Sequence, residues 1–178
     1  MTRWIALLRG VNVGGGNKIA MPALRDSCER CGFERVATYI QSGNLVFDAA
    51  GDEASVTAAL RTVLVDEHAL AVPVVVRTAK EMDRLADSHP GLAAGIDSKY
   101  LHVVFLDKRV KRADAARLDR ARFEPDTFEV DGREIYVTYP GGSGRSKLTI
   151  DVFEKAFGVA ATARNVNTVH KLIELAAS

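Results

Sequence analysis

Short apolar segments alternate with two amphipathic stretches in the first 78 residues, and this alternation constrains the fold more than any other feature of the sequence. The first amphipathic stretch has Pro22 where a helix begins and Gly32 where it ends. The predicted elements, in chain order, are a strand at 3–9, a helix between 22 and 32, strands at 36–40 and 45–47, a helix at 52–70 and a strand at 72–77. This order predicts a ferredoxin-like βαββαβ unit with strand order 4-1-3-2.

The pattern restarts after a joint marked by His89-Pro90-Gly91 and Gly95. The elements predicted beyond the joint are strands at 101–106, 127–130, 135–139 and 161–163 and helices at 110–121, 149–157 and 165–177, with an Asp131-Gly132 hairpin turn. We therefore expect an α+β protein with two ferredoxin-like (βαββαβ) halves in tandem. The expected domains are a first half at 1–78, a linker with a short helix at 79–98, and a second half with a C-terminal helix at 99–178.

Composition leaves room for a hydrophobic core without a stabilising metal or disulfide. The chain has 178 residues, of which 47% are hydrophobic and 26% charged, and its net charge is +1. A nearly neutral chain has no global field that attracts nucleic acid or an anionic membrane. The one N-terminal apolar run ends at Arg9, which is too short for a signal peptide or a membrane span. We expect a cytoplasmic protein with no membrane contact.

The two cysteines, Cys28 and Cys31, have the C-x-x-C spacing of redox and zinc motifs. Met21 and Leu24 continue the same stripe at helical spacing, so the favoured interpretation is a pair of buried free thiols. A structural zinc site needs about four ligands, and the histidines supply no second pair. We expect no metal and no cofactor.

The loop from Arg9 to Lys18 is rich in glycine and asparagine and lies between a predicted strand and a predicted helix. Exposed backbone N–H groups and a helix N-terminus favour an anion at such a place. The loop does not match a P-loop, because Gly16 stands where the lysine belongs. The alternative is a glycine turn required only by backbone geometry.

The predicted sheet order brings this loop close to a second polar segment, the turn Gln41-Ser42-Gly43-Asn44. The first two strands run in the same direction, so the loop after the first and the turn after the second share one end of the sheet. The candidate ligand-binding residues at this end are Arg9, Asn12, Asn17, Lys18, Gln41, Ser42 and Asn44. By composition alone, the turn is explained as an ordinary β-turn.

Two further segments have similar chemistry in the second half. The loop Gly141-Gly142-Ser143-Gly144-Arg145-Ser146-Lys147 is flexible, basic and rich in hydroxyl groups, and Ala163–Lys171 begins the last helix. The candidate residues here are Ser146, Lys147, Arg164, Asn165, Asn167 and Lys171. Helix capping is the alternative interpretation, by Ser146 or Thr149 in the first segment and by Asn165 or Asn167 in the second.

Residues 107–122 contain seven basic and three acidic side chains. A basic helix can follow phosphates, but a solvated face of mixed charge is the favoured interpretation. Neither half contains the aromatic motif by which the RNA-recognition fold stacks bases.

Four motifs together resemble the bacterial domain-of-unknown-function 1697 family. They are Arg9–Lys18 with Met21, Tyr39–Phe47, Gly144–Thr149, and Thr162–Leu172, and they cover almost the whole chain. The resemblance implies two ferredoxin-like halves and no known activity. An aromatic residue is common in the family where this chain has Val166.

We expect from these patterns that the protein binds an anionic, phosphorylated ligand through its Gly/Asn-rich loops. The partner would be an anionic small molecule, such as a nucleotide, or a nucleic acid. A structural or protein-interaction module is the second hypothesis, in which the same residues are folding determinants. A small-molecule enzyme of unknown reaction is the third, and it lacks an obvious acid–base pair.

Overall fold

The computed structural model describes residues 1–178, which form two compact units. The first unit comprises Met1–Asp83 together with Lys171–Ser178, and the second comprises Arg84–His170. The last eight residues therefore belong to the first unit, whereas the sequence analysis assigns them to the second half. None of the helices has both the length and the apolar character of a membrane span.

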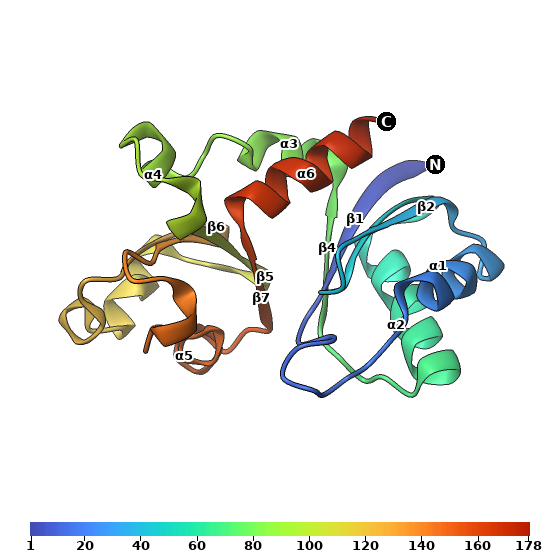
Figure 1. Cartoon of the computed structure of the whole chain (residues 1–178), viewed down its shortest axis with the longest axis horizontal. Helices are drawn as coiled ribbons and strands as arrows, with labels where there is room; N and C mark the ends of the chain where they lie inside the picture. The colour runs from blue at the N-terminus through green and yellow to red at the C-terminus, as the bar shows by residue number, and fades with distance from the viewer. The chain divides into compact units, whose positions relative to one another are not determined.

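The first unit has the strand order and the antiparallel pairings predicted for residues 1–78. Its sheet has the order β2-β3-β1-β4. Its elements are β1 (Thr2–Leu8), α1 (Met21–Arg30), β2 (Glu34–Tyr39), β3 (Asn44–Ala49), α2 (Glu53–His68), β4 (Val74–Thr78) and most of α3 (Ala79–Leu85), which ends in the second unit. Both long helices lie on one face of this sheet (Figure 1).

The core of the first unit follows from the alternation of each strand. Trp4, Ala6 and Leu8 of β1 point to the helices, where they join apolar residues of α1 and α2 such as Leu24 and Leu60. Ile5 and Leu7, which point to the opposite face of the sheet, are also buried, so β1 is apolar on both faces. The pairing of β1 with β3 and β4 holds the β1–α1 loop at one end of the sheet.

The second unit is built on a three-stranded antiparallel sheet with the order β6-β5-β7. Its elements are α4 (Pro90–Ala93), β5 (Leu101–Val110), β6 (Thr127–Thr138), α5 (Ile150–Phe157), β7 (Ala161–Asn165), the start of α6 (Val166–Ala177), and four 3₁₀ helices, η1 (Ser98–Tyr100), η2 (Arg112–Arg117), η3 (Arg120–Phe123) and η4 (Ser143–Arg145). Phe153 of α5, Ala115 of η2 and Phe123 of η3 pack against the same core as Val104 and Ile135 of the sheet.

The expected second βαββαβ half is wrong in two respects. The predicted hairpin at Asp131-Gly132 does not form, because β6 continues through it, and Gly132 has φ +66° and pairs with Val110 on an extended β5. A glycine with positive φ also fits an irregular step in a long strand, so it does not identify a turn by itself. The sheet therefore has three strands, not four.

The predicted helix at 110–121 is also wrong, since the chain forms η2 and η3 there instead. Val110 of the predicted helix belongs to β5, and the segment that follows adds only Ala115, Leu118 and Phe123 to the core, which is too few apolar side chains for the broad stripe of an amphipathic α-helix. Short 3₁₀ turns bury Ala115 and Phe123, half-bury Leu118 and leave the many charged side chains in solvent.

The end of α6 is held within the first unit by two arginines of its sheet. Arg3 Nη2 donates to the carbonyl of Leu175 (3.1 Å) and Arg35 Nη1 to that of Ser178 (3.4 Å). Cations near the last carbonyls of a helix are favoured by the helix dipole. Both arginines also pair with Asp48, and Arg35 Nε lies 2.5 Å from its carboxylate.

Candidate anion-binding site

Asn12 joins the β1–α1 loop to the β2–β3 turn. Its side-chain amide donates to the carbonyls of Ile19 and Gln41 (2.8 Å each), and its Oδ1 accepts from the Ile19 N–H (2.9 Å). The backbone of Asn12 has φ +54°, a conformation that asparagine tolerates better than most residues. The structure thus brings the two segments together, as the predicted sheet order requires.

The other asparagines of this end also bind the backbone of the protein itself. Asn17, at φ +47°, donates from Nδ2 to the carbonyl of Gly10 (3.1 Å). Asn44 is buried and donates to the carbonyl of Tyr39 (3.0 Å) and to the hydroxyl of Ser42 (3.1 Å). These side-chain bonds close the loop and the turn, so the asparagines act first as folding determinants.

A hollow of about 480 Å³ remains at this end, lined by Asn12, Gly15, Lys18, Ile19, Ala20 and Gln41. Lys18 is the one cation of its lining, and the start of α1 behind it has no side-chain cap at Ala20. Arg9 is half-buried and does not line the hollow. The predicted site at this end therefore reduces to one lysine beside a set of backbone amides.

In the second unit, the glycine-rich loop is held in place by Ser146. The Ser146 hydroxyl donates to Asp126 Oδ2 (2.6 Å) and accepts from the backbone N–H of Leu148 (2.8 Å), whose carbonyl accepts from Tyr139 Oη (3.0 Å). The Ser146 hydroxyl therefore stabilises the conformation of the loop. Arg145 and Lys147, on either side of it, are exposed.

Five cations gather around two adjoining hollows of this unit. The smaller, of about 220 Å³, lies against the glycine-rich loop and is lined by Arg122, Phe123, Glu124, Pro125, Asp126, Gly141, Gly142, Arg145, Ser146 and Lys147. The larger, of about 590 Å³, is lined by Arg117, Leu118, Arg122, Phe123, Lys147, Val152, Lys155 and Ala156. The two share Arg122, Phe123 and Lys147. We call them together the cationic pocket.

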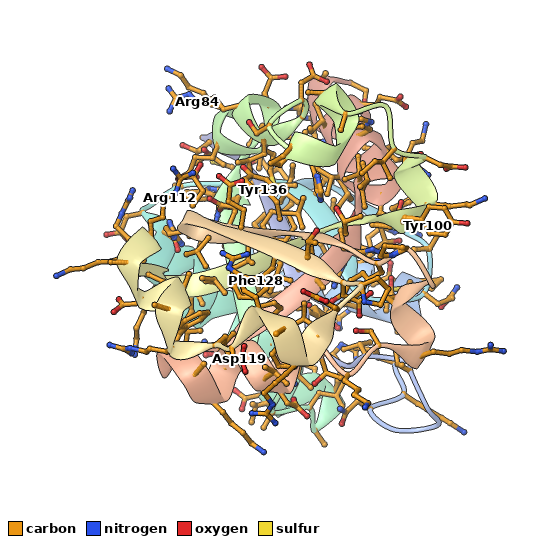
Figure 2. All side chains as sticks on the ribbon, turned by 90° about the vertical axis from the view of Figure 1, so that its left-hand side faces the viewer. Arg84, Tyr100, Arg112, Asp119, Phe128 and Tyr136 are labelled. Carbon is orange, nitrogen blue, oxygen red and sulfur yellow. The ribbon has the colours of Figure 1, made fainter.

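Most of these cations have no acidic partner. Arg117 pairs with Asp114 (3.1 Å), but Arg122, Arg145, Lys147 and Lys155 are exposed and form no ion pair. Nearby basic residues behave differently, since Arg112 pairs with Glu129, and Arg120 donates to the carbonyl of Phe128 and covers its ring (4.2 Å to the centroid). Arg112, Asp119 and Phe128 mark this neighbouring region in Figure 2. The solvated basic face predicted for 107–122 thus describes only part of the segment.

The predicted residues at the start of α6 do not gather into an anion site. Arg164 is buried on β7, where Nη1 donates to Thr162 Oγ1 and the Ala163 carbonyl (2.8 Å each), and burial lowers its pKa to about 10. Asn165 donates from Nδ2 to the carbonyls of Ser98 (2.9 Å) and Leu101 (3.1 Å), and its Oδ1 accepts from the Asn167 N–H (2.8 Å). Capping of α6 therefore explains Asn165.

The remaining two candidates of this segment are exposed. Lys171 Nζ lies 2.8 Å from Glu174 Oε2 on the next turn of the helix, and this hydrogen bond raises the pKa of the lysine. Asn167 contributes its backbone N–H to the cap, and its side chain lies at the surface. Neither lines the cationic pocket.

The cysteines do not form a redox pair in this structure. Cys28 is buried as expected, and burial raises the pKa of its thiol to about 12. Cys31 is exposed, contrary to the prediction, because α1 ends at Arg30 and leaves Cys31 beyond the apolar stripe. Although the residue is exposed, the sulfur of Cys31 is partly buried where it donates to the Cys28 carbonyl (3.0 Å), and this desolvation raises its pKa, so both thiols stay protonated at neutral pH.

Two histidines of the second unit make its stability depend on pH. His89 is buried, and its Nδ1 accepts from the Gly91 N–H (3.0 Å), so Nε2 carries the proton that is donated to the Val137 carbonyl (3.1 Å). Protonation of Nδ1 would remove the first bond and leave a buried charge. Burial lowers the pKa of His89 and also that of His102, whose Nδ1 has no partner.

We expect the free energy of unfolding to decrease as the pH falls below 6.5, the ordinary histidine value. The unfolded chain takes up protons first, because the folded-state pKa values are lower, and each histidine contributes up to about 1.4 kcal/mol per pH unit. Urea unfolding between about pH 8 and about pH 5 measures this slope. The slope should be shallower in His89→Gln. A wild-type stability that does not change over this range would contradict the prediction.

The fold is α+β with two antiparallel sheets, and comparisons with known proteins agree with it. A family model described as "Protein of unknown function (DUF1697)" matches residues 1–136, so the chain belongs to this family, as its motifs predict. A search of curated proteins finds no match.

A solved structure, that of the conserved bacterial protein SP0830 from Streptococcus pneumoniae, is similar with a TM-score of 0.78. The similarity covers 100% of this chain and 99% of that chain at 20% sequence identity. At this level of identity it shows the fold alone.

Four of the five cations of the cationic pocket are not among the binding residues predicted from the sequence. Arg145 lies in the glycine-rich loop but is not one of its candidate residues. Arg117 and Arg122 lie in the basic segment interpreted as a solvated face, and Lys155 was not singled out. A signal for Lys155 is present, since Val152, Lys155 and Ala156 follow the helical spacing i, i+3, i+4 and share one face of α5. What the sequence lacks is the fold of η2 and η3, which carries the two arginines to that face.

Proposed function

We propose that the protein binds an anionic, phosphorylated ligand and that the anion lies in the cationic pocket of the second unit. One observation carries the proposal: four exposed cations without acidic partners converge on adjoining hollows. Unpaired like charges repel one another, so such a cluster destabilises the free protein slightly. A bound anion removes that cost and gains charge-assisted hydrogen bonds.

The residue types at the pocket suit a phosphate. Arginine presents a planar fork of donors to phosphate oxygens, and lysine adds a mobile charge. The loop at Gly141 and Gly142 leaves the backbone of the smaller hollow open to a close approach. Glu124 and Asp126 also line this hollow, and Asp126 is occupied by Ser146.

The hollow of the first unit supports the same function less well. It has one lysine, and the asparagines predicted to bind the ligand are bound to the backbone instead. For this end of the molecule, the second hypothesis, that the motif residues are folding determinants, has the better support. The proposed binding function therefore rests on the second unit. We further propose that the protein acts in the cytoplasm.

The test is calorimetric titration with inorganic pyrophosphate. We expect measurable binding by the wild type and a loss of about tenfold or more in Arg122→Ala and in Lys147→Ala, since each removes a charged hydrogen-bond donor. Lys111→Ala is the matched control, because Lys111 is exposed in the same unit and lines neither hollow. Absence of binding by the folded wild type, or equal losses in all three variants, would refute the proposal.

A further inference from the structure

The larger hollow of the cationic pocket differs from the smaller one in having an apolar wall. Leu118, Val152 and Ala156 are half-buried there, and the buried Phe123 also lines the hollow. A site for a bare inorganic anion needs no such surface, because phosphate oxygens gain nothing from contact with methyl groups. The wall therefore indicates that the ligand has an organic part.

The positions of the cations limit the shape of that ligand. Arg122 and Lys147 line both hollows, whereas Arg145 lines only the smaller and Arg117 and Lys155 only the larger. A ligand with its phosphates at the glycine-rich loop would thus extend past Arg122 and Lys147 into the larger hollow. At about 590 Å³, this hollow has the size of a small-molecule site.

We infer that the ligand is a small nucleoside phosphate, with its phosphates at the glycine-rich loop and its nucleoside in the larger hollow. This inference rests on the proposed function and names the class of ligand for the same site. A heteroaromatic base suits a wall of aliphatic carbons edged by arginines, because guanidinium groups stack on flat rings. Arg117 and Arg122 are the arginines at that edge.

The structure favours a small nucleotide over a nucleic-acid strand. A strand needs a continuous track of cations, and beyond the pocket the neighbouring basic residues Arg112 and Arg120 are already engaged by Glu129 and by Phe128. A strand also needs exposed aromatic rings on which successive bases stack, but Phe123 and Phe128 are both buried. The cationic surface is thus confined to the pocket and does not continue as a track for a strand.

The decisive measurement compares inorganic tripolyphosphate with adenosine triphosphate by calorimetry on the full chain at equal ionic strength. We expect the nucleotide to bind about tenfold or more tightly, because the nucleoside adds buried apolar area to the same phosphate contacts. Equal affinities would overturn the inference and leave the proposed function standing. Failure of both compounds to bind would refute the proposed function itself, and the inference with it.

Two variants test the wall separately from the charges. Val152→Thr keeps the side-chain shape and adds a hydroxyl, and Leu118→Ser removes the apolar contact, with circular dichroism to verify folding. Each should reduce the preference for the nucleotide severalfold without changing tripolyphosphate binding. Val65→Thr is the matched control, since Val65 is an exposed valine of α2 in the first unit. An unchanged preference in folded Val152→Thr would overturn the inference.

An oligonucleotide completes the comparison. A single strand of about ten nucleotides should bind no more tightly per molecule than the free nucleotide, since the patch accommodates only one. Binding of the strand about a hundredfold more tightly than adenosine triphosphate, with a steep dependence on salt, would overturn the assignment to a small nucleotide.

Discussion

Replacing Gly43 with alanine is expected to lower the free energy of unfolding by about 2–4 kcal/mol, since it combines backbone strain with overpacking. Gly43 has φ +77°, and a Cβ built on it would lie 2.7 Å from Leu8 Cβ, closer than side chains approach. The turn cannot move away freely, because the Gly43 carbonyl accepts from the Leu8 N–H (2.8 Å). Chemical denaturation measures the loss.

Gly14→Ala separates the two causes of this destabilisation. Gly14 also has a positive φ of +62°, but no atom lies within 4 Å of the position of its Cβ. Alanine there should cost only the strain, about 1 kcal/mol. Equal losses in the two variants would show that the contact with Leu8 contributes nothing.

Asn12→Ala is expected to destabilise the protein by about 2–3 kcal/mol, because one side chain makes three hydrogen bonds to the backbone. The substitution leaves the N–H and carbonyl of Ile19 and the carbonyl of Gln41 without this partner, and alanine is less tolerant than asparagine of φ +54°. The loop and the turn would lose the bond that joins them. Denaturant unfolding measures the stability.

Asn17→Ala is the matched variant, since Asn17 has a similar φ of +47° and a single side-chain bond to the Gly10 carbonyl. Its expected cost is about 1 kcal/mol. The pair also tests the role of the loop, because a ligand-binding role for Asn12 would lower affinity at unchanged stability. That outcome would contradict the structural role assigned to Asn12.

The first unit was predictable because its local signals agree with one another. Pro22 and Gly32 bound the first helix, Asp52 caps the second by accepting from the Ser55 N–H (2.9 Å), and the strands alternate in register with the core. Local sequence patterns are sufficient to predict helices and strands when each element buries one face against its neighbours. The proximity of the loop to the turn followed from the strand order alone.

The second unit was less predictable because its signals are ambiguous. Asp131-Gly132 is a strong hairpin signal, but whether such a glycine turns the chain depends on the strand beside it, here β5 extended to Val110. The segment before it contains enough alanine and arginine to suggest a helix but too few apolar residues to dock one. Tertiary packing decided both cases.

The candidate site illustrates a limit of residue type as a guide. Asparagine and arginine can bind a ligand or the chain itself, and the pattern does not distinguish these roles. The side chains of Asn12 and Arg164 form hydrogen bonds within the protein. Arg122 and Lys155 line the pocket and have no acidic partner, although the sequence did not indicate them as binding residues. Only the folded arrangement shows which side chains remain available.

The assignment of the last eight residues to the first unit has a consequence for how the protein is made. Topologically, residues 84–170 are an insertion between the two segments of the first unit. A ribosome must therefore complete this insertion before the carbonyl groups that Arg3 and Arg35 bind have been synthesised. The unit that begins first is therefore completed last, because its final residues are synthesised only after residues 84–170.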